Sequence, residues 1–147
     1  MKTIIKTIFN SGSNSTQVSI ALLIMRLAIG SFMLTHGFGK LMMLLADGPA
    51  QFADPIGMGM TLSLVMAVFA EFICSILIIF GFGTRLAAIP LLFTMSVAVF
   101  IVHAADPFAV KELAALYGLA YLVLTIAGAG NYSLDYLIGR KLHESHS

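Results

Sequence analysis

The sequence predicts an all-α integral membrane protein built as a bundle of four transmembrane helices. Of its 147 residues, 59% are hydrophobic and 10% are charged, whereas soluble domains carry roughly 25% charged residues. The mean hydropathy is +0.98. The apolar residues form four long runs, which lack the alternation typical of a membrane β-barrel. This composition excludes a soluble enzyme, and the net charge of only +1 argues against nucleic acid as a partner.

The chain divides into three parts along its length. Residues 1–17 are predicted to be a polar N-terminal segment lying on the membrane surface, because its apolar groups end at Phe9 and are too short for a signal peptide. Residues 18–136 hold the four apolar runs and form the membrane domain. Residues 137–147 are predicted to be a polar C-terminal tail. The single cysteine, Cys74, excludes a disulfide within the chain and predicts a small buried side chain.

The four apolar runs cover residues 18–45, 56–80, 86–102 and 113–127. A helix needs about 20 apolar residues to cross the hydrocarbon core, and the third and fourth runs reach that length only with their flanking residues. The break GFGTR separates the second run from the third. The runs therefore predict four consecutive membrane-spanning helices in the lipid bilayer.

The basic residues divide unequally between the two sides of the membrane. Four spans place five on the side of the chain ends, namely Lys2, Lys6, Arg85, Arg140 and Lys141. The other side holds Lys40 and Lys111. The excess of positive charge on cytoplasmic segments predicts that both termini lie in the cytoplasm.

Two ionisable residues, Arg26 and Glu71, lie inside apolar runs. Arg26 is about 12 Å from the start of the first run and Glu71 about 15 Å from the end of the second, at 1.5 Å per residue. The two runs are antiparallel, so we expect these charges at similar depth. An unpaired charge at the bilayer centre costs at least about 2.5–3.5 kcal/mol. The pair either is an ion pair that fixes helix register or forms a site for an anionic or carbonyl-bearing ligand.

A second polar group is expected at the opposite end of the bundle. His36 and Lys40 are four residues apart on one helix, while His103 and Asp106 follow the third run. Together they could line a polar pocket where histidines relay protons, as a quinone site requires. Alternatively they form an interfacial collar in which Lys40 extends to the headgroups. Neither haem nor another metal is expected, because two histidines without further ligands are weak support for one.

The fourth run carries Tyr117, Tyr121 and Thr125 at intervals of four, which places them on one helix face. The tyrosines could donate hydrogen bonds to a carbonyl ligand or to Glu71. Packing residues with a satisfied hydroxyl are the alternative.

Several of these residues together resemble the DoxX family of small bacterial four-helix membrane proteins. The resemblance lies in RLAIGSFMLTHGFGKL (residues 26–41), Glu71, GFGTRLAAIP (residues 81–90) and GAGNYSLD (residues 128–135). It covers about residues 18–136. The family resemblance implies a multi-pass protein of the bacterial inner membrane, related to the DoxD-type subunit of thiosulfate:quinone oxidoreductase.

The resemblance and the polar residues together predict a quinone-interacting or accessory subunit of a membrane oxidoreductase. The chain encodes no redox centre, so the expected cofactor is quinone, and a redox partner protein or substrate supplies the electrons. A homo-oligomer is the other association considered, and a non-enzymatic scaffold or small-solute carrier is the alternative function. The candidate binding residues are Arg26, Glu71, His36, Lys40, His103, Tyr117 and Tyr121.

Overall fold

The four predicted spans are helices in the computed structural model, which describes residues 15–49 and 51–144. Each span is long and apolar enough to cross a membrane. No strand occurs in the described residues, so the prediction of an all-helical, four-span fold is confirmed. In chain order the spans are α2 (Thr16–Leu45); α3 (Met60–Val68), η1 (Phe69–Cys74) and α4 (Ser75–Phe80); α5 (Thr84–Val97) and η2 (Ala98–Val102); and α6 (Phe108–Ala127).

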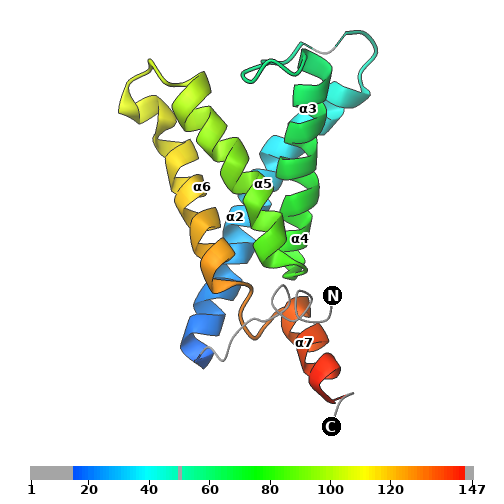
Figure 1. Cartoon of the computed structure of the whole chain (residues 1–147), viewed down its shortest axis with the longest axis vertical. Helices are drawn as coiled ribbons and strands as arrows, with labels where there is room; N and C mark the ends of the chain where they lie inside the picture. Colours follow the sequence, from blue (N-terminus) through cyan, green and yellow to red (C-terminus); the bar gives the residue numbers. More distant parts are fainter. Residues whose placement is uncertain (1–14, 50, 145–147) are drawn as a thin grey trace.

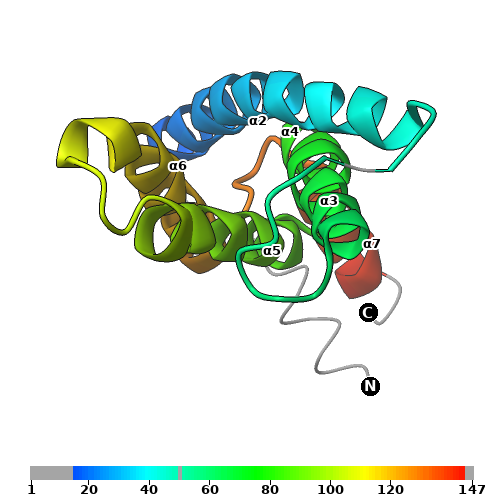
Figure 2. The same ribbon diagram turned by 90° about the horizontal axis from the view of Figure 1, so that it is seen from above.

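The bundle has two distinct ends (Figure 1). Helix α2 begins at the lower end, where α4 turns into α5 and α7 (Leu134–Glu144) lies; we call this the α7 end. The opposite end, which we call the loop end, carries the connections 46–59 and 103–107. Helix α5 packs along α6, while α2 packs against the second span. Figure 1 shows α3 and α5 diverging toward the loop end, and Figure 2 shows the 46–59 connection extending over the space between them.

Helix α2 carries one buried stripe at three- and four-residue spacing, which meets the second span at Arg26, Gly30 and Gly37. Two glycines in this stripe allow the backbones to approach closely. A Cβ at Gly30 would lie 2.7 Å from Ile79 Cγ1, and one at Gly37 would lie 2.5 Å from the Glu71 carbonyl. The stripe comprises Ser19, Leu22, Arg26, Gly30, Met33 and Gly37.

The predicted polar C-terminal tail is helical over its described part, because residues 137–144 belong to α7. Leu134, Leu137 and Ile138 give the apolar spacing of an amphipathic helix. At the other chain end, Ser15 Oγ accepts the Val18 amide and caps α2. Most of the predicted N-terminal surface segment, residues 1–14, lies outside the described residues.

The core lies between all four spans and is largely apolar. Its fully buried side chains include Ile78, Leu91, Tyr121 and Leu124. Cys74 is buried among them as expected. This core fixes the helices that carry the polar groups described next.

Candidate functional site

Arg26 is fully buried at the α7 end, where backbone carbonyls accept hydrogen bonds from its guanidinium group. Nη1 donates to Ile78 O at 3.2 Å, and Nη2 donates to Tyr132 O at 2.5 Å. These carbonyls belong to the end of α4 and to the segment before α7. Arg26 therefore joins three parts of the chain that are far apart in sequence.

Asp135 completes this cluster, which we call the Arg26 cluster. Its carboxylate interacts electrostatically with Arg26 and accepts the Gly83 and Thr84 amides at 2.6 and 3.0 Å, capping α5. Gly81, at φ +67°, ends α4 with the paired turn hydrogen bonds of a Schellman motif. A Cβ at Gly81 would collide with the Arg26 guanidinium. The cluster thus locks the α4–α5 turn onto α2 and α7.

The expected pairing of Arg26 with Glu71 is therefore wrong. Arg26 is level with the end of α4, whereas Glu71 is level with Gly37, eleven residues further along α2. Eleven residues of helix span about 16 Å. The depth estimate assumed that the first two spans end at the same plane. In the structure α2 extends beyond Gly81, and its first turns are covered by Gly130 and Asn131 instead.

Glu71 is paired with Lys40, which reaches it from one turn beyond Gly37. Lys40 Nζ donates to Glu71 Oε2. The carboxylate side chain is 5% exposed and the lysine side chain 25% exposed. Glu71 belongs to the π-helix η1, a local irregularity that frequently accompanies functional sites. Within the sequence HGFGK, Gly37 thus contacts the backbone of Glu71, and Lys40 supplies the cation that pairs with its carboxylate.

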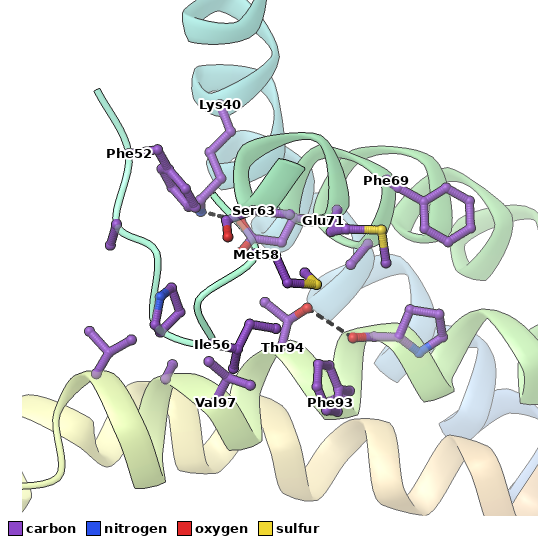
Figure 3. Close-up of a pocket in the computed structure, with 18 of the residues that line it drawn as sticks. Lys40, Phe52, Ile56, Met58, Ser63, Phe69, Glu71, Phe93, Thr94 and Val97 are labelled. Carbon is purple, nitrogen blue, oxygen red and sulfur yellow. Dashed lines mark hydrogen bonds and ion pairs between the residues drawn. The ribbon is translucent and has the colours of Figure 1, made fainter. Parts of the chain in front are cut away.

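The Lys40–Glu71 pair borders a cavity of about 550 Å³ near the loop end (Figure 3). This volume lies within the range of about 300–1,000 Å³ typical of small-molecule sites. Most of the walls are aliphatic or aromatic, with Phe69 from η1 and Phe93 and Val97 from α5. Two hydroxyls in the walls are already engaged, because Ser63 donates to Asp54 and Thr94 donates to Pro90 O. The ion pair is therefore the main polar feature that a ligand would meet.

The 46–59 connection forms the outer wall of the cavity through residues such as Phe52, Ile56 and Met58. Asp54 anchors this wall, since its carboxylate accepts the Met58 and Gly59 amides at 2.9 and 2.7 Å and the Ser63 hydroxyl at 2.8 Å. The Ser63 hydroxyl and these amides lower the pKa of Asp54 below its usual value. The connection is consequently tied to the start of α3.

The side wall of the cavity faces outward between the second and third spans. Met66 and Phe69 on one side and Ile89 and Phe93 on the other line the cavity, and each is between 45% and 57% exposed on the lipid-facing surface. These are the spans that diverge in Figure 1. An apolar molecule in the bilayer could therefore reach the ion pair from the side.

The remaining predicted residues do not share this cavity. His36 contacts the edge of Tyr117, with ring centroids 6.4 Å apart, and Tyr117 stacks on Tyr121 at 6.2 Å. Tyr121 is fully buried, and its hydroxyl has no hydrogen-bond partner among the described residues. An unsatisfied buried hydroxyl costs about 1–3 kcal/mol, so packing alone does not account for a tyrosine here.

The four residues of the predicted polar pocket at the loop end do not meet in this cavity. His103 Nδ1 contacts Asp106 Oδ2 at 2.8 Å on the exposed turn after η2, and of the four only Lys40 lines the cavity. His103 and Asp106 are three residues apart, so a local contact satisfies both. The described residues include no group of three His, Cys, Asp or Glu side chains able to hold a metal ion.

Two contributors were not identified from sequence. Asp135 lies after the last apolar run, where a carboxylate is common. Its position in the first turn of an amphipathic helix is a usable signal. Gly37 could have been found as a buried position seven residues after Gly30.

Comparisons with known proteins add a family relationship. The DoxX family model matches residues 21–104. A protein of Haemophilus influenzae described as uncharacterized is 32% identical over 121 residues, which cover 76% of this chain and 85% of that protein. No solved structure matches the chain. The matched segment includes Lys40, Glu71 and the α5 side of the cavity.

Proposed function

The chain belongs to the DoxX family of membrane proteins, and from this premise we propose that it is a quinone-interacting subunit of a bacterial inner-membrane oxidoreductase. The observation that carries the proposal is the apolar cavity with the Lys40–Glu71 pair in its wall. The proposed orientation places the α7 end, with Arg85, Arg140 and Lys141, in the cytoplasm.

The cavity has the chemistry that a quinone head group requires. Its aliphatic and aromatic walls would hold the ring and the start of an isoprenoid tail. The Lys40 ammonium is a hydrogen-bond donor for a ring carbonyl, and the Glu71 carboxylate is an acceptor for the hydroxyl of the reduced form. The outward-facing side wall suits a ligand that is dissolved in the bilayer.

In this proposal the chain binds the quinone, and a partner protein supplies the electrons. When bound, a quinone would supply two-electron, two-proton chemistry, with a redox partner protein as the source of the electrons. The residues of this chain bind and orient the ring, exclude water through the 46–59 connection, and hold a proton at Glu71. Arg26 has no part in this site, because backbone carbonyls and Asp135 engage it elsewhere.

Binding of a short-tailed ubiquinone to the purified protein tests this function. Isothermal titration should give a Kd that rises at least tenfold in Lys40→Met and in Glu71→Gln, because each variant removes a polar contact with the ring. Lys111→Met is the matched control, since this lysine is bonded to Ala104 O on the exposed turn, and its Kd should not change.

The double variant Lys40→Met/Glu71→Gln guards against misfolding, because it leaves no isolated charge in the wall. An unchanged Kd in this folded double variant, or no binding by the wild type, would refute the quinone assignment. Uptake of a water-soluble solute into vesicles without quinone binding would favour a carrier instead.

A further inference from the structure

Helix α7 carries apolar and basic side chains on its exposed surface. Leu134 and Leu137, in its first turn, are 41% and 49% exposed. Arg140 and Lys141 are also exposed and lie about one turn further along the helix. The Asp135 carboxylate is buried and already accepts two amides of the α4–α5 turn. Exposed leucines beside cations are typical of helices that lie at a membrane surface.

The start of α7 is fixed at the level where the spans end. The Asp135 amide donates to Gly81 O at 2.9 Å, which ties α7 to the end of α4. In Figure 1, α7 begins level with the first turns of α2. Those turns belong to a membrane span and expose Val18 and Ile20 by 46% and 44%. The exposed leucines of α7 therefore lie where the hydrocarbon core of the bilayer ends.

The residues around these leucines fit the same boundary. Tyr132, two residues before α7, is 49% exposed, and tyrosine is enriched where hydrocarbon meets the headgroups. Lys141 is four residues beyond Leu137, which corresponds to at most about 6 Å along a helix. The headgroup layer on each side of a bilayer is about 5–8 Å thick. The cations can therefore reach lipid phosphates while the leucines stay against acyl chains.

We propose that the exposed surface of α7 docks on anionic phospholipids. Leu134 and Leu137 lie among the acyl chains, and Arg140 and Lys141 bind the phosphates. Charge complementarity favours this occupant, because the exposed charged side chains described on α7 are both cations. Each such cation near an anionic surface strengthens the attraction roughly fivefold. This surface is separate from the cavity, so the inference does not depend on the proposed quinone function.

A single fluorophore on α7 tests the docking in the full-length protein. The chain contains no tryptophan, so the fluorescence of Leu137→Trp reports this surface alone. The variant is reconstituted in vesicles of equal parts phosphatidylglycerol and phosphatidylcholine, with bromine on the acyl chains of one lipid or the other. Bromine quenches tryptophan at short range. We expect at least twofold stronger quenching when the anionic lipid carries the bromine.

Two comparisons isolate the contribution of the cations. Adding Arg140→Gln and Lys141→Gln to Leu137→Trp should bring the two quenching values within about 20% of each other. Adding Lys111→Gln instead should preserve the difference, because this lysine is bonded to Ala104 O at the loop end. In the separate variant Leu116→Trp, on the lipid-exposed side of α6, the two lipids should quench equally.

The possible failures are distinct. Absence of quenching by both lipids in Leu137→Trp would overturn the docking and favour a water-exposed helix or one covered by a protein. Equal quenching by the two lipids would overturn the preference for anionic lipid. A preference that persists without Arg140 and Lys141 would overturn the role of these cations. All the substituted side chains on α7 are exposed, so the variants keep the contacts that hold the bundle together.

Discussion

Arg26, which is fully buried, and Lys40, which is partly exposed, lie on the same helix but have opposite surroundings. Arg26 is enclosed at the α7 end, where carbonyls from two other segments and Asp135 engage it. Lys40 has a single described partner, Glu71, and both line an apolar cavity. A buried charge therefore marks a candidate site when its surroundings leave hydrogen-bonding capacity beside open space. Burial alone identifies Arg26, which is structural.

Replacing Arg26 should give the largest effect on stability and little effect on binding. Arg26→Met leaves the carbonyls of Ile78 and Tyr132 without their donor, and each buried acceptor left unsatisfied costs about 1–3 kcal/mol. Unfolding in mixed micelles with increasing SDS measures the change in free energy. The folded fraction should bind short-tailed ubiquinone with the wild-type Kd. If Arg26→Met costs no more than the exposed control Lys111→Met, the structural assignment fails.

Replacing Gly37 should disturb the Glu71 site through the backbone of η1, which Gly37 contacts. The Cβ of Gly37→Ala would lie 2.5 Å from the carbonyl of Glu71, and overpacking of this kind costs about 1–3 kcal/mol. The backbone of η1 must shift, so quinone affinity should fall at least tenfold. Gly39→Ala is the matched control, since a Cβ there meets nothing within 4 Å. Equal affinities in the two variants would contradict the role given to the close helix contact.

Replacing Asp54 should have the smallest effect, confined to the outer wall of the cavity. In Asp54→Asn the Met58 and Gly59 amides should exchange with deuterium faster, measured by mass spectrometry. Asp47→Asn, in the same connection, is the control and should leave this exchange unchanged.

The Asp54 contribution also has a defined pH dependence. Its pKa is lower in the folded state than the ordinary value of 3.8. The carboxylate therefore stabilises the connection above that value, and the contribution is lost as pH falls through the lower folded pKa. Loss of amide protection at a pH well above 3.8 would contradict this.

Sequence reasoning predicted the spans because four apolar runs leave little choice of fold. It selected Lys40 and Glu71 as candidates but paired Glu71 with Arg26, since depth counted from the ends of apolar runs ignores where each helix begins. Gly130 and Asn131 return to cover the first turns of α2, and no pattern in the apolar runs predicts that contact. The cavity also escaped prediction, because it depends on the divergence of α3 from α5 and on the fold of the 46–59 connection.

We propose that a lipid-soluble quinone occupies the cavity beside Lys40 and Glu71. Photolabelling of the membrane-embedded protein with an azido-quinone, followed by mass spectrometry of its fragments, tests this most directly. We expect label on residues 52–58, 66–71 and 89–102, with competition by unlabelled quinone and loss of label in the double variant Lys40→Met/Glu71→Gln. Competable label at the Arg26 cluster, or label that unlabelled quinone does not displace, would contradict it.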